Sequence, residues 1–173
     1  MALAVARYHD NDHGSDECAG SFFAKIVKPS VDDYLAKPSE FRTAFAAVTA
    51  LFHFHEWLFV YKQAELEAKY NLRFSGKGDF WGYVESLVPL SKFIRNLANA
   101  SKHVKLTIRP STSMTHIANT TIQSTGYGQG GYGQGGYGGS TMVMKDGLVD
   151  VPLDDCVNAM MAFWEALVAE LYP

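Results

Sequence analysis

Apolar side chains recur at helical spacing along most of this chain, and the longest such stretch lies near its middle. Ser39 is placed to cap a helix that we expect to run from Glu40 to about Lys69. Apolar side chains go almost all the way round this helix: Phe41, Phe45, Val48, Leu51, Phe52, Phe54, Leu58, Phe59 and Val60. Because a helix that is apolar on every side must be packed on several flanks, the pattern predicts a buried central helix.

Shorter helical segments surround this central helix in the sequence. Residues 30–37 read as a short helix that Pro38 stops, and Asp79 is placed to cap a helix that Pro89 divides into residues 79–87 and 89–103. After Pro152, either Asp154 or Asp155 caps a last amphipathic helix that reaches Leu171. Its apolar face comprises Val157, Met160, Met161, Trp164, Leu167, Val168 and Leu171.

Between residues 104 and 152 the pattern changes from helical to strand-like. Residues 104–109 alternate, residues 115–124 are rich in β-branched side chains, and Asp146-Gly147 marks the turn of a hairpin. We therefore predict a mainly α fold: a bundle of about four helices with a small antiparallel β-meander inserted before the last helix. Residues 1–20 read as a flexible arm, and residues 21–173 as one domain with a β insertion at 104–152.

Composition narrows the class of protein. The formal net charge of −3 disfavours non-specific nucleic-acid binding through bulk charge, so any RNA contact needs a local patch. Cys18 and Cys156 lie far apart without CxxC spacing, which fits a reducing cytoplasm and predicts neither a metal site nor a cofactor. The apolar central stretch is interrupted by His53, His55 and Glu56, so we interpret it as a core helix and not a membrane span.

The run from Arg95 to His103 is the first candidate site. Arg95, Asn99, Lys102 and His103 share the polar side of an amphipathic helix with Lys92 and Asn96, and this side contains no acidic residue. Arg and Lys suit a phosphate group, and His can carry a proton, which is the equipment for cleaving RNA without a metal. The alternative is that these residues are simply the solvated face that every amphipathic helix has.

A second candidate, His53-Phe54-His55-Glu56-Trp57, lies inside the central helix. His53 and Glu56 are neighbours on the helix surface, and Trp57 lies one turn beyond His53. The carboxylate either orients the imidazole for chemistry or forms with it a buried, hydrogen-bonded polar pair that is structural. We favour the structural interpretation of His53, Glu56 and Trp57, and His55 faces nearly the opposite way.

The Gly/Tyr-rich loop at residues 126–140 repeats tyrosine at positions 127, 132 and 137. It has no Gly-Lys-Ser/Thr ending and opens no helix, so it is not a phosphate-binding loop. Stacking of bases on its tyrosines competes with the simpler interpretation of a mobile hairpin extension.

Two motifs resemble known families. The elements His53-x-x-Glu56-Trp57 and Ala98-Asn99-x-x-Lys102-His103 are similar to those of an uncharacterised group of bacterial proteins, a resemblance that covers about residues 40–106 and implies no assigned activity. The segment from Arg95 also resembles the HEPN superfamily of small helical bundles, many of them metal-independent ribonucleases of toxin and phage-defence systems. The signature of that family is an Arg, a polar residue and then a His after four to six intervening positions; here Asn96 follows Arg95, and seven residues lie between Arg95 and His103.

The resemblance implies a HEPN-like module that binds RNA or a nucleotide, with His103 transferring a proton and Arg95 and Lys102 stabilising charge. It also implies a homodimer formed through the Arg95 face. The alternative function is a non-catalytic interaction or structural module that presents the β-meander to a protein partner. Whether the chain is an enzyme stays open at this point.

Overall fold

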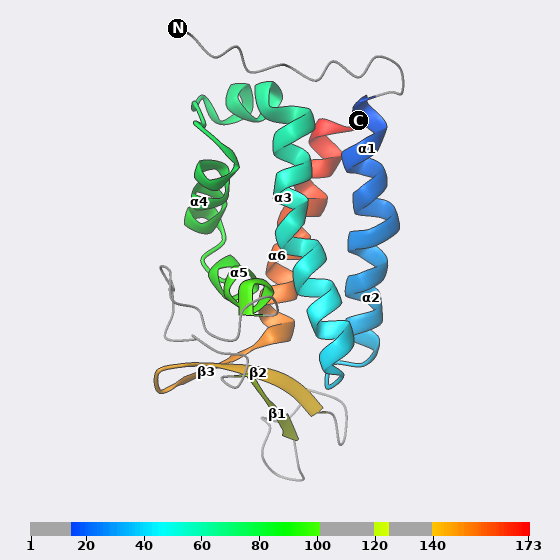
Figure 1. The fold of residues 1–173 in the computed structure, drawn as a ribbon, viewed down its shortest axis with the longest axis vertical. Helices are drawn as coiled ribbons and strands as arrows, with labels where there is room; N and C mark the ends of the chain where they lie inside the picture. The colour runs from blue at the N-terminus through cyan, green and yellow to red at the C-terminus, as the bar shows by residue number, and fades with distance from the viewer. Residues whose placement is uncertain (1–14, 101–119, 125–139) are drawn as a thin grey trace, which may run out of the picture.

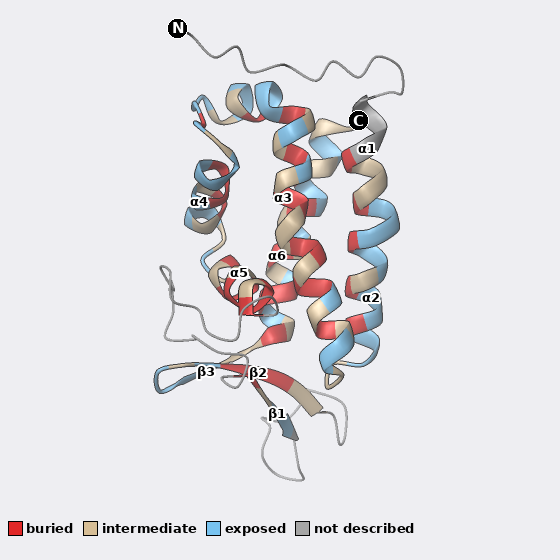
Figure 2. Cartoon of the chain, viewed as in Figure 1, coloured by how far each residue is buried: buried red, intermediate tan, exposed pale blue. Residues whose placement is uncertain are grey.

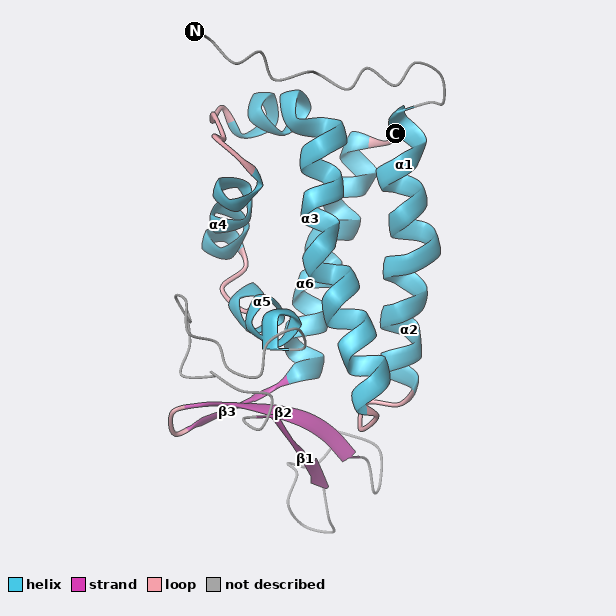
Figure 3. Ribbon diagram, viewed as in Figure 1, coloured by secondary structure: helices cyan, strands magenta, loops and turns pink. Residues whose placement is uncertain are grey.

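The computed structural model describes residues 15–100, 120–124 and 140–173 of the chain. The helices are α1 (Ser15–Phe22), the π-helical turn η1 (Phe23–Val27), α2 (Lys28–Ala36), α3 (Phe41–Tyr70), α4 (Lys77–Leu87), α5 (Ser91–Ala100) and α6 (Leu153–Leu171). The strands are β1 (Thr120–Ser124), β2 (Ser140–Asp146) and β3 (Val149–Pro152). This confirms the predicted mainly α fold with a small antiparallel sheet before the last helix (Figures 1 and 3).

Helix α3 is the centre of the bundle. Segments α1 to α2 run along one side of it, α4 and α5 lie on the other, α6 packs behind it, and the sheet closes one end (Figure 1). In the outer helices the buried residues lie mostly on the sides of the ribbon that face α3 and α6 (Figure 2). The largest fully buried side chains include Trp164, Phe54, Phe80, Leu51 and Leu58. The apolar pattern round the central helix therefore predicted its position correctly.

The prediction of a flexible arm over residues 1–20 was wrong for its last part, because α1 begins at Ser15. Ala19 is fully buried, and Phe22 and Phe23 stack against aromatic side chains of α3, so tertiary packing stabilises a helix whose polar sequence gives little signal. Residues 1–14 lie outside the described part of the chain.

A π-helical turn joins α1 to α2 without a break. Within η1 the backbone stays in the right-handed helical region, and the Lys28 N–H donates to the Phe23 carbonyl. Pro29 follows immediately, and it has no N–H to donate and crowds the preceding turn of an α-helix. The wider turn accommodates this proline, so the helix predicted for residues 30–37 begins earlier and ends at Ala36.

Helix α3 has the predicted length but a different start. Glu40 is its N-cap and makes no side-chain capping bond, so the prediction that Ser39 caps the helix was wrong. The Thr43 hydroxyl donates to the Glu40 carbonyl instead. The helix kinks at Lys62 and ends at Asn71, which adopts the left-handed conformation. Among the described residues, α3 is long and apolar enough to cross a membrane, and 44% of its most apolar 18-residue window is buried inside the bundle.

Pro89 separates α4 from α5, as predicted. Helix α4 starts at Lys77, two residues earlier than expected, and Asp79 lies in its first turn. The predicted capping by Asp79 was therefore wrong in detail: its carboxylate accepts a hydrogen bond from the Ser75 N–H at 3.1 Å and another from the Ser75 hydroxyl. The strand predicted at residues 104–109 and the tyrosine repeat lie outside the described residues.

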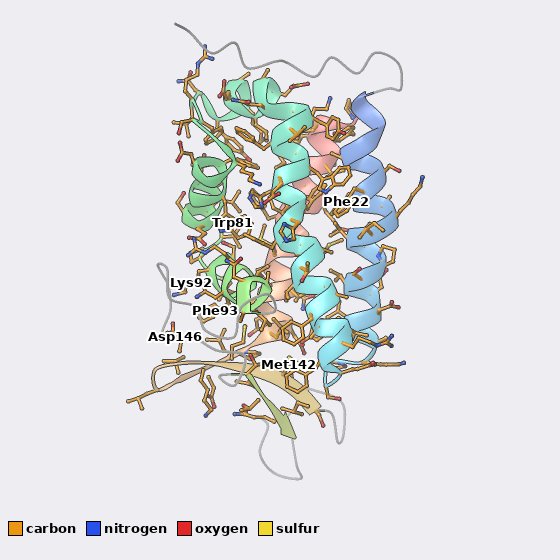
Figure 4. The ribbon with its side chains drawn as sticks, viewed as in Figure 1. Phe22, Trp81, Lys92, Phe93, Met142 and Asp146 are labelled. Atoms are coloured by element: carbon orange, nitrogen blue, oxygen red, sulfur yellow. The ribbon has the colours of Figure 1, made fainter. Side chains whose placement is uncertain are left out.

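The described strands form an antiparallel sheet in the order β1-β2-β3. The predicted hairpin is present, but Asp146 pairs with Val149, so its two-residue loop is Gly147-Leu148, and Gly147 has a φ of +66°. Met142 and Met144 of β2 are fully buried against the bundle. Figure 4 shows Met142 at the junction of sheet and helices.

Pro152, and neither Asp154 nor Asp155, is the N-cap of α6, so the predicted cap was wrong. The Asp154 carboxylate has other partners: the buried Tyr34 hydroxyl donates to one oxygen, and the Thr141 hydroxyl donates to the other at 3.1 Å. This carboxylate therefore joins α2, β2 and α6. Burial, with Asp154 beside it, raises the pKa of Tyr34 far above its ordinary value, so its hydroxyl keeps its proton.

Candidate functional site at the junction of α3, α4 and α5

Arg95 lies on α5 and is held by a residue of α4. Its Nη1 is 2.9 Å from Oε1 of Glu85, and the two side chains are 24% and 20% exposed. The same carboxylate oxygen accepts a hydrogen bond of 2.7 Å from Nε1 of Trp81. Because the Trp81 indole holds Glu85 and Glu85 holds Arg95, the guanidinium has a defined orientation.

The rest of the α5 polar face is less solvated than the sequence indicated. Asn96 is 2% exposed, so the alternative of a fully solvated face does not hold for this residue. Lys92 lies 3.8 Å from Asp146 of β2, and Figure 4 shows the two on facing elements. Helix α5 contains no acid of its own, as predicted, but its neighbours α4 and β2 supply one acid each to this face.

Asn99 is half-buried, one turn beyond Arg95. Lys102 and His103 lie outside the described residues, so their predicted roles rest on the sequence. Within the described part of α5, Arg95 is the predicted site residue whose partners the structure shows.

His53 and Glu56 form the neighbouring pair that the sequence predicted. His53 Nδ1 lies 3.6 Å from Glu56 Oε1, and Lys77 Nζ of α4 lies 2.9 Å from Glu56 Oε2. Burial raises the pKa of the Glu56 carboxyl, but the hydrogen bond and charge of Lys77 outweigh it, so that pKa lies below its ordinary value. Glu56 is therefore ionised at neutral pH. The pair is half-buried, with side chains 26% and 33% exposed, and so is more accessible than a core pair.

His55 points away from this pair, into the space between α3 and α4. It is 3% exposed, its Nδ1 donates to the Phe52 carbonyl, and its ring contacts Phe52 and Trp81 with centroids 4.9 Å away in each case. Burial lowers the pKa of His55 to about 4, and the Phe52 carbonyl offsets only part of that effect. The imidazole is therefore neutral at pH 7 and carries its proton on Nδ1.

These contacts form a polar junction between α3, α4 and α5 in two groups: Glu56 pairs with His53 and Lys77 in one, and Trp81 joins His55 to Glu85 and Arg95 in the other. Its members, which we call the junction residues, are His53, His55, Glu56, Lys77, Trp81, Glu85 and Arg95. Figure 4 places Trp81 between α4 and α3, where it links His55 to Glu85. The sequence pattern predicted His53, Glu56 and Arg95 as candidate site residues but gave no prediction for Lys77, Trp81 and Glu85. The four-residue spacing of Trp81 and Glu85 on a helix is the signal that was available for the last two.

Among the described residues, no three His, Cys, Asp or Glu side chains gather as a metal-binding group would require. Cys156 is fully buried, and burial raises its pKa to about 12, so it is an unreactive thiol. The junction residues themselves offer one guanidinium, one ammonium group, two carboxylates and two imidazoles.

Comparisons with protein families, with curated proteins and with solved structures found no match to this chain.

Proposed function

We propose that this chain is a HEPN-like helical bundle that binds RNA or a nucleotide through the face of α5 that carries Arg95. One observation supports this most directly: Glu85 holds the Arg95 guanidinium at Nη1, and the arginine side chain is still 24% exposed. A guanidinium has further N–H donors in a planar fork, and that fork matches the oxygens of a phosphate. An anchored, partly exposed arginine loses little side-chain freedom on binding, which favours affinity.

Cleavage is the further step that the resemblance implies. The 2′-oxygen of the RNA attacks the adjacent phosphorus while His103 takes the proton from that hydroxyl; the bond from phosphorus to the 5′-oxygen breaks, this oxygen leaves as a hydroxyl with a proton from water, and a 2′,3′-cyclic phosphate remains. Arg95 and Lys102 stabilise the charge that develops on the phosphate, and Asn99 binds a neighbouring oxygen. In this proposal the active dimer pairs two Arg95 faces.

The first test compares two arginines that each lie in an ion pair with a glutamate. Arg95→Gln is expected to weaken binding of a fluorescent single-stranded RNA by about tenfold or more and to reduce the salt dependence of the affinity by about one phosphate contact. Arg73→Gln is the matched control, because Arg73 pairs with Glu67 at 3.3 Å but is 94% exposed and lies in the connection between α3 and α4. It should change the affinity by less than about twofold.

The same RNA, incubated without divalent metal, reports cleavage. His103→Ala should abolish cleavage while leaving binding and the melting temperature nearly unchanged. A wild-type protein that binds no RNA, or an equal loss of affinity in Arg95→Gln and Arg73→Gln, would contradict the proposal.

The second candidate is a non-catalytic interaction module, and the burial of Asn96 together with the Lys92–Asp146 contact favours it. In that case the polar face of α5 supports the packing of α4, α5 and the sheet. The sheet would present a protein-binding surface at the hairpin, where Leu148 is fully exposed and Val149 is 61% exposed. Asn99→Ala and His53→Ala would then each lower the free energy of unfolding by about 1–3 kcal/mol, and the wild type would not bind RNA.

A further inference from the structure

Helix α5 is accessible to solvent along one narrow row of side chains. Seven of its ten residues are buried, and the other three, Lys92, Arg95 and Asn99, are partly exposed. Residues three and four positions apart are neighbours on a helix, so these three side chains lie on one side of α5. From Lys92 to Asn99 the helix rises by about 10 Å. The accessible surface of α5 is therefore a row of two cations and an amide.

Acids of two neighbouring elements hold these cations in different ways. Glu85 of α4 lies 2.9 Å from Arg95 and is itself held by the Trp81 indole. Asp146 Oδ2 of β2 lies 3.8 Å from Lys92 Nζ, which is longer than a hydrogen bond, and the two side chains are 26% and 36% exposed. A solvated ion pair without a hydrogen bond contributes little to stability. Another anion can therefore replace Asp146 beside Lys92 at small cost.

The two cationic groups are directed towards different neighbours of α5. Helix α5 lies between α4 and the sheet, and Arg95 contacts α4 whereas Lys92 contacts β2 (Figure 1). Figure 4 shows Lys92 next to Asp146, on the side of α5 that is nearer to the sheet. A nucleoside monophosphate has one phosphate and reaches one of these groups. An RNA strand has a phosphate at every residue, so it can meet both along the row.

Resting on the RNA binding proposed above, we infer that the row on α5 binds an RNA strand in preference to a free mononucleotide. Lys92 binds a second phosphate beside the one at Arg95, and Asp146 occupies Lys92 until the strand displaces it. The guanidinium fork suits one phosphate, and the ammonium group binds the next as a point charge. Asp146 thereby weakens the binding of any ligand that does not reach Lys92 with an anion of its own.

Variants of Lys92 test the second phosphate contact. We would measure the affinity for a fluorescent single-stranded RNA of about ten residues and, by competition, for adenosine 5′-monophosphate. Lys92→Gln should weaken RNA binding by about fivefold, reduce the slope of log affinity against log salt by about 0.7, and leave the affinity for the monophosphate unchanged. Lys92→Arg keeps the charge and should keep the RNA affinity. This rescue keeps the test informative even if the glutamine variant is less stable.

Variants of the hairpin test the displacement of Asp146. Asp146→Asn should strengthen RNA binding by about two- to fivefold, which is the factor by which a solvated ion pair competes. Asp150→Asn is the matched control, because it makes the same change of net charge in the same hairpin and Asp150 contacts Lys145 and Gln123 within the sheet. It should change the affinity by less than about twofold. The gain from Asp146→Asn should disappear in combination with Lys92→Gln, because it acts through that ammonium group.

Different results would overturn the inference and the proposed function. Unchanged RNA affinity in Lys92→Gln, or equal affinities of Asp146→Asn and Asp150→Asn, would overturn the inference, and RNA binding that still depends on Arg95 would leave the proposed function in place. A lower melting temperature of Asp146→Asn with unchanged RNA affinity would overturn the inference too, because the contact with Lys92 would then only support packing. Absence of RNA binding by the wild type and by Asp146→Asn would overturn both.

Discussion

Burial of the His55 imidazole makes the stability of the bundle depend on pH. An unfolded histidine has a pKa of about 6.5, whereas the folded protein lowers it to about 4. Between these values the unfolded chain binds more protons than the folded one, so acid favours unfolding. His55 should therefore reduce the free energy of unfolding by about 3 kcal/mol as the pH falls from 6.5 to 4.

The substitution His55→Phe isolates this effect, because phenylalanine keeps the contacts with Phe52 and Trp81 but has no proton to gain. Urea denaturation of both proteins at several pH values should show the wild type losing more stability than the variant over that range. Glu56 and the other carboxyls titrate in both proteins, so the difference between the two curves reports His55. Parallel curves would show that His55 does not titrate in this way.

At the scale of the elements, the left-handed end of α3 gives a second prediction. Asn71 has a φ of 51°, its N–H donates to the Ala68 carbonyl at 3.3 Å, and the Leu72 N–H donates to the Glu67 carbonyl at 3.1 Å. Since glycine adopts this conformation without strain, Asn71→Gly should be neutral or slightly stabilising. Asn71→Ala should cost about 1 kcal/mol of unfolding free energy.

Asn158, exposed inside α6, is the matched control. There alanine should stabilise the protein by about 0.5 kcal/mol, and glycine should destabilise it, because the backbone is helical. Chemical denaturation of the four variants should therefore show that alanine and glycine change the free energy of unfolding with opposite signs at the two asparagines. The same sign at both positions would show that backbone conformation does not decide these effects.

The elements were largely predictable, and their ends were not. Proline and apolar periodicity placed α3, the break at Pro89 and α6, because these are strong local signals. The predicted caps at Ser39, at Asp79 and at Asp154 or Asp155 failed, and for Asp79 and Asp154 the structure shows a competing partner of the carboxylate. For Asp154 the competitor was a tyrosine of α2 that is distant in sequence. The ion pair between Glu85 and Arg95 was unpredictable for the same reason, since the acid comes from another helix.

At the scale of the whole molecule, the Tyr34 hydroxyl joins the N-terminal helices to α6 through Asp154. Tyr34→Phe removes this bond inside the core and leaves the carboxylate with one partner fewer. The free energy of unfolding should fall by about 1–3 kcal/mol, measured in urea. Tyr70→Phe is the control, because Tyr70 is half-buried and packs on Tyr83 through its ring, and it should change stability by less than about 0.5 kcal/mol. Equal losses of unfolding free energy in Tyr34→Phe and Tyr70→Phe would show that the hydrogen bond from Tyr34 to Asp154 does not stabilise the fold.

The π-helical turn at η1 has one more residue than an α-helical path between the same ends needs. A homologue with a one-residue deletion between Phe23 and Val27 would keep a continuous helix, but everything before the deletion would rotate by about 100° about its axis. The Phe22 ring would then no longer stack on the Trp57 indole. The length of this short segment, more than its composition, therefore decides whether Phe22 stacks on Trp57. Relatives with a deletion at this point should lack this stacking contact.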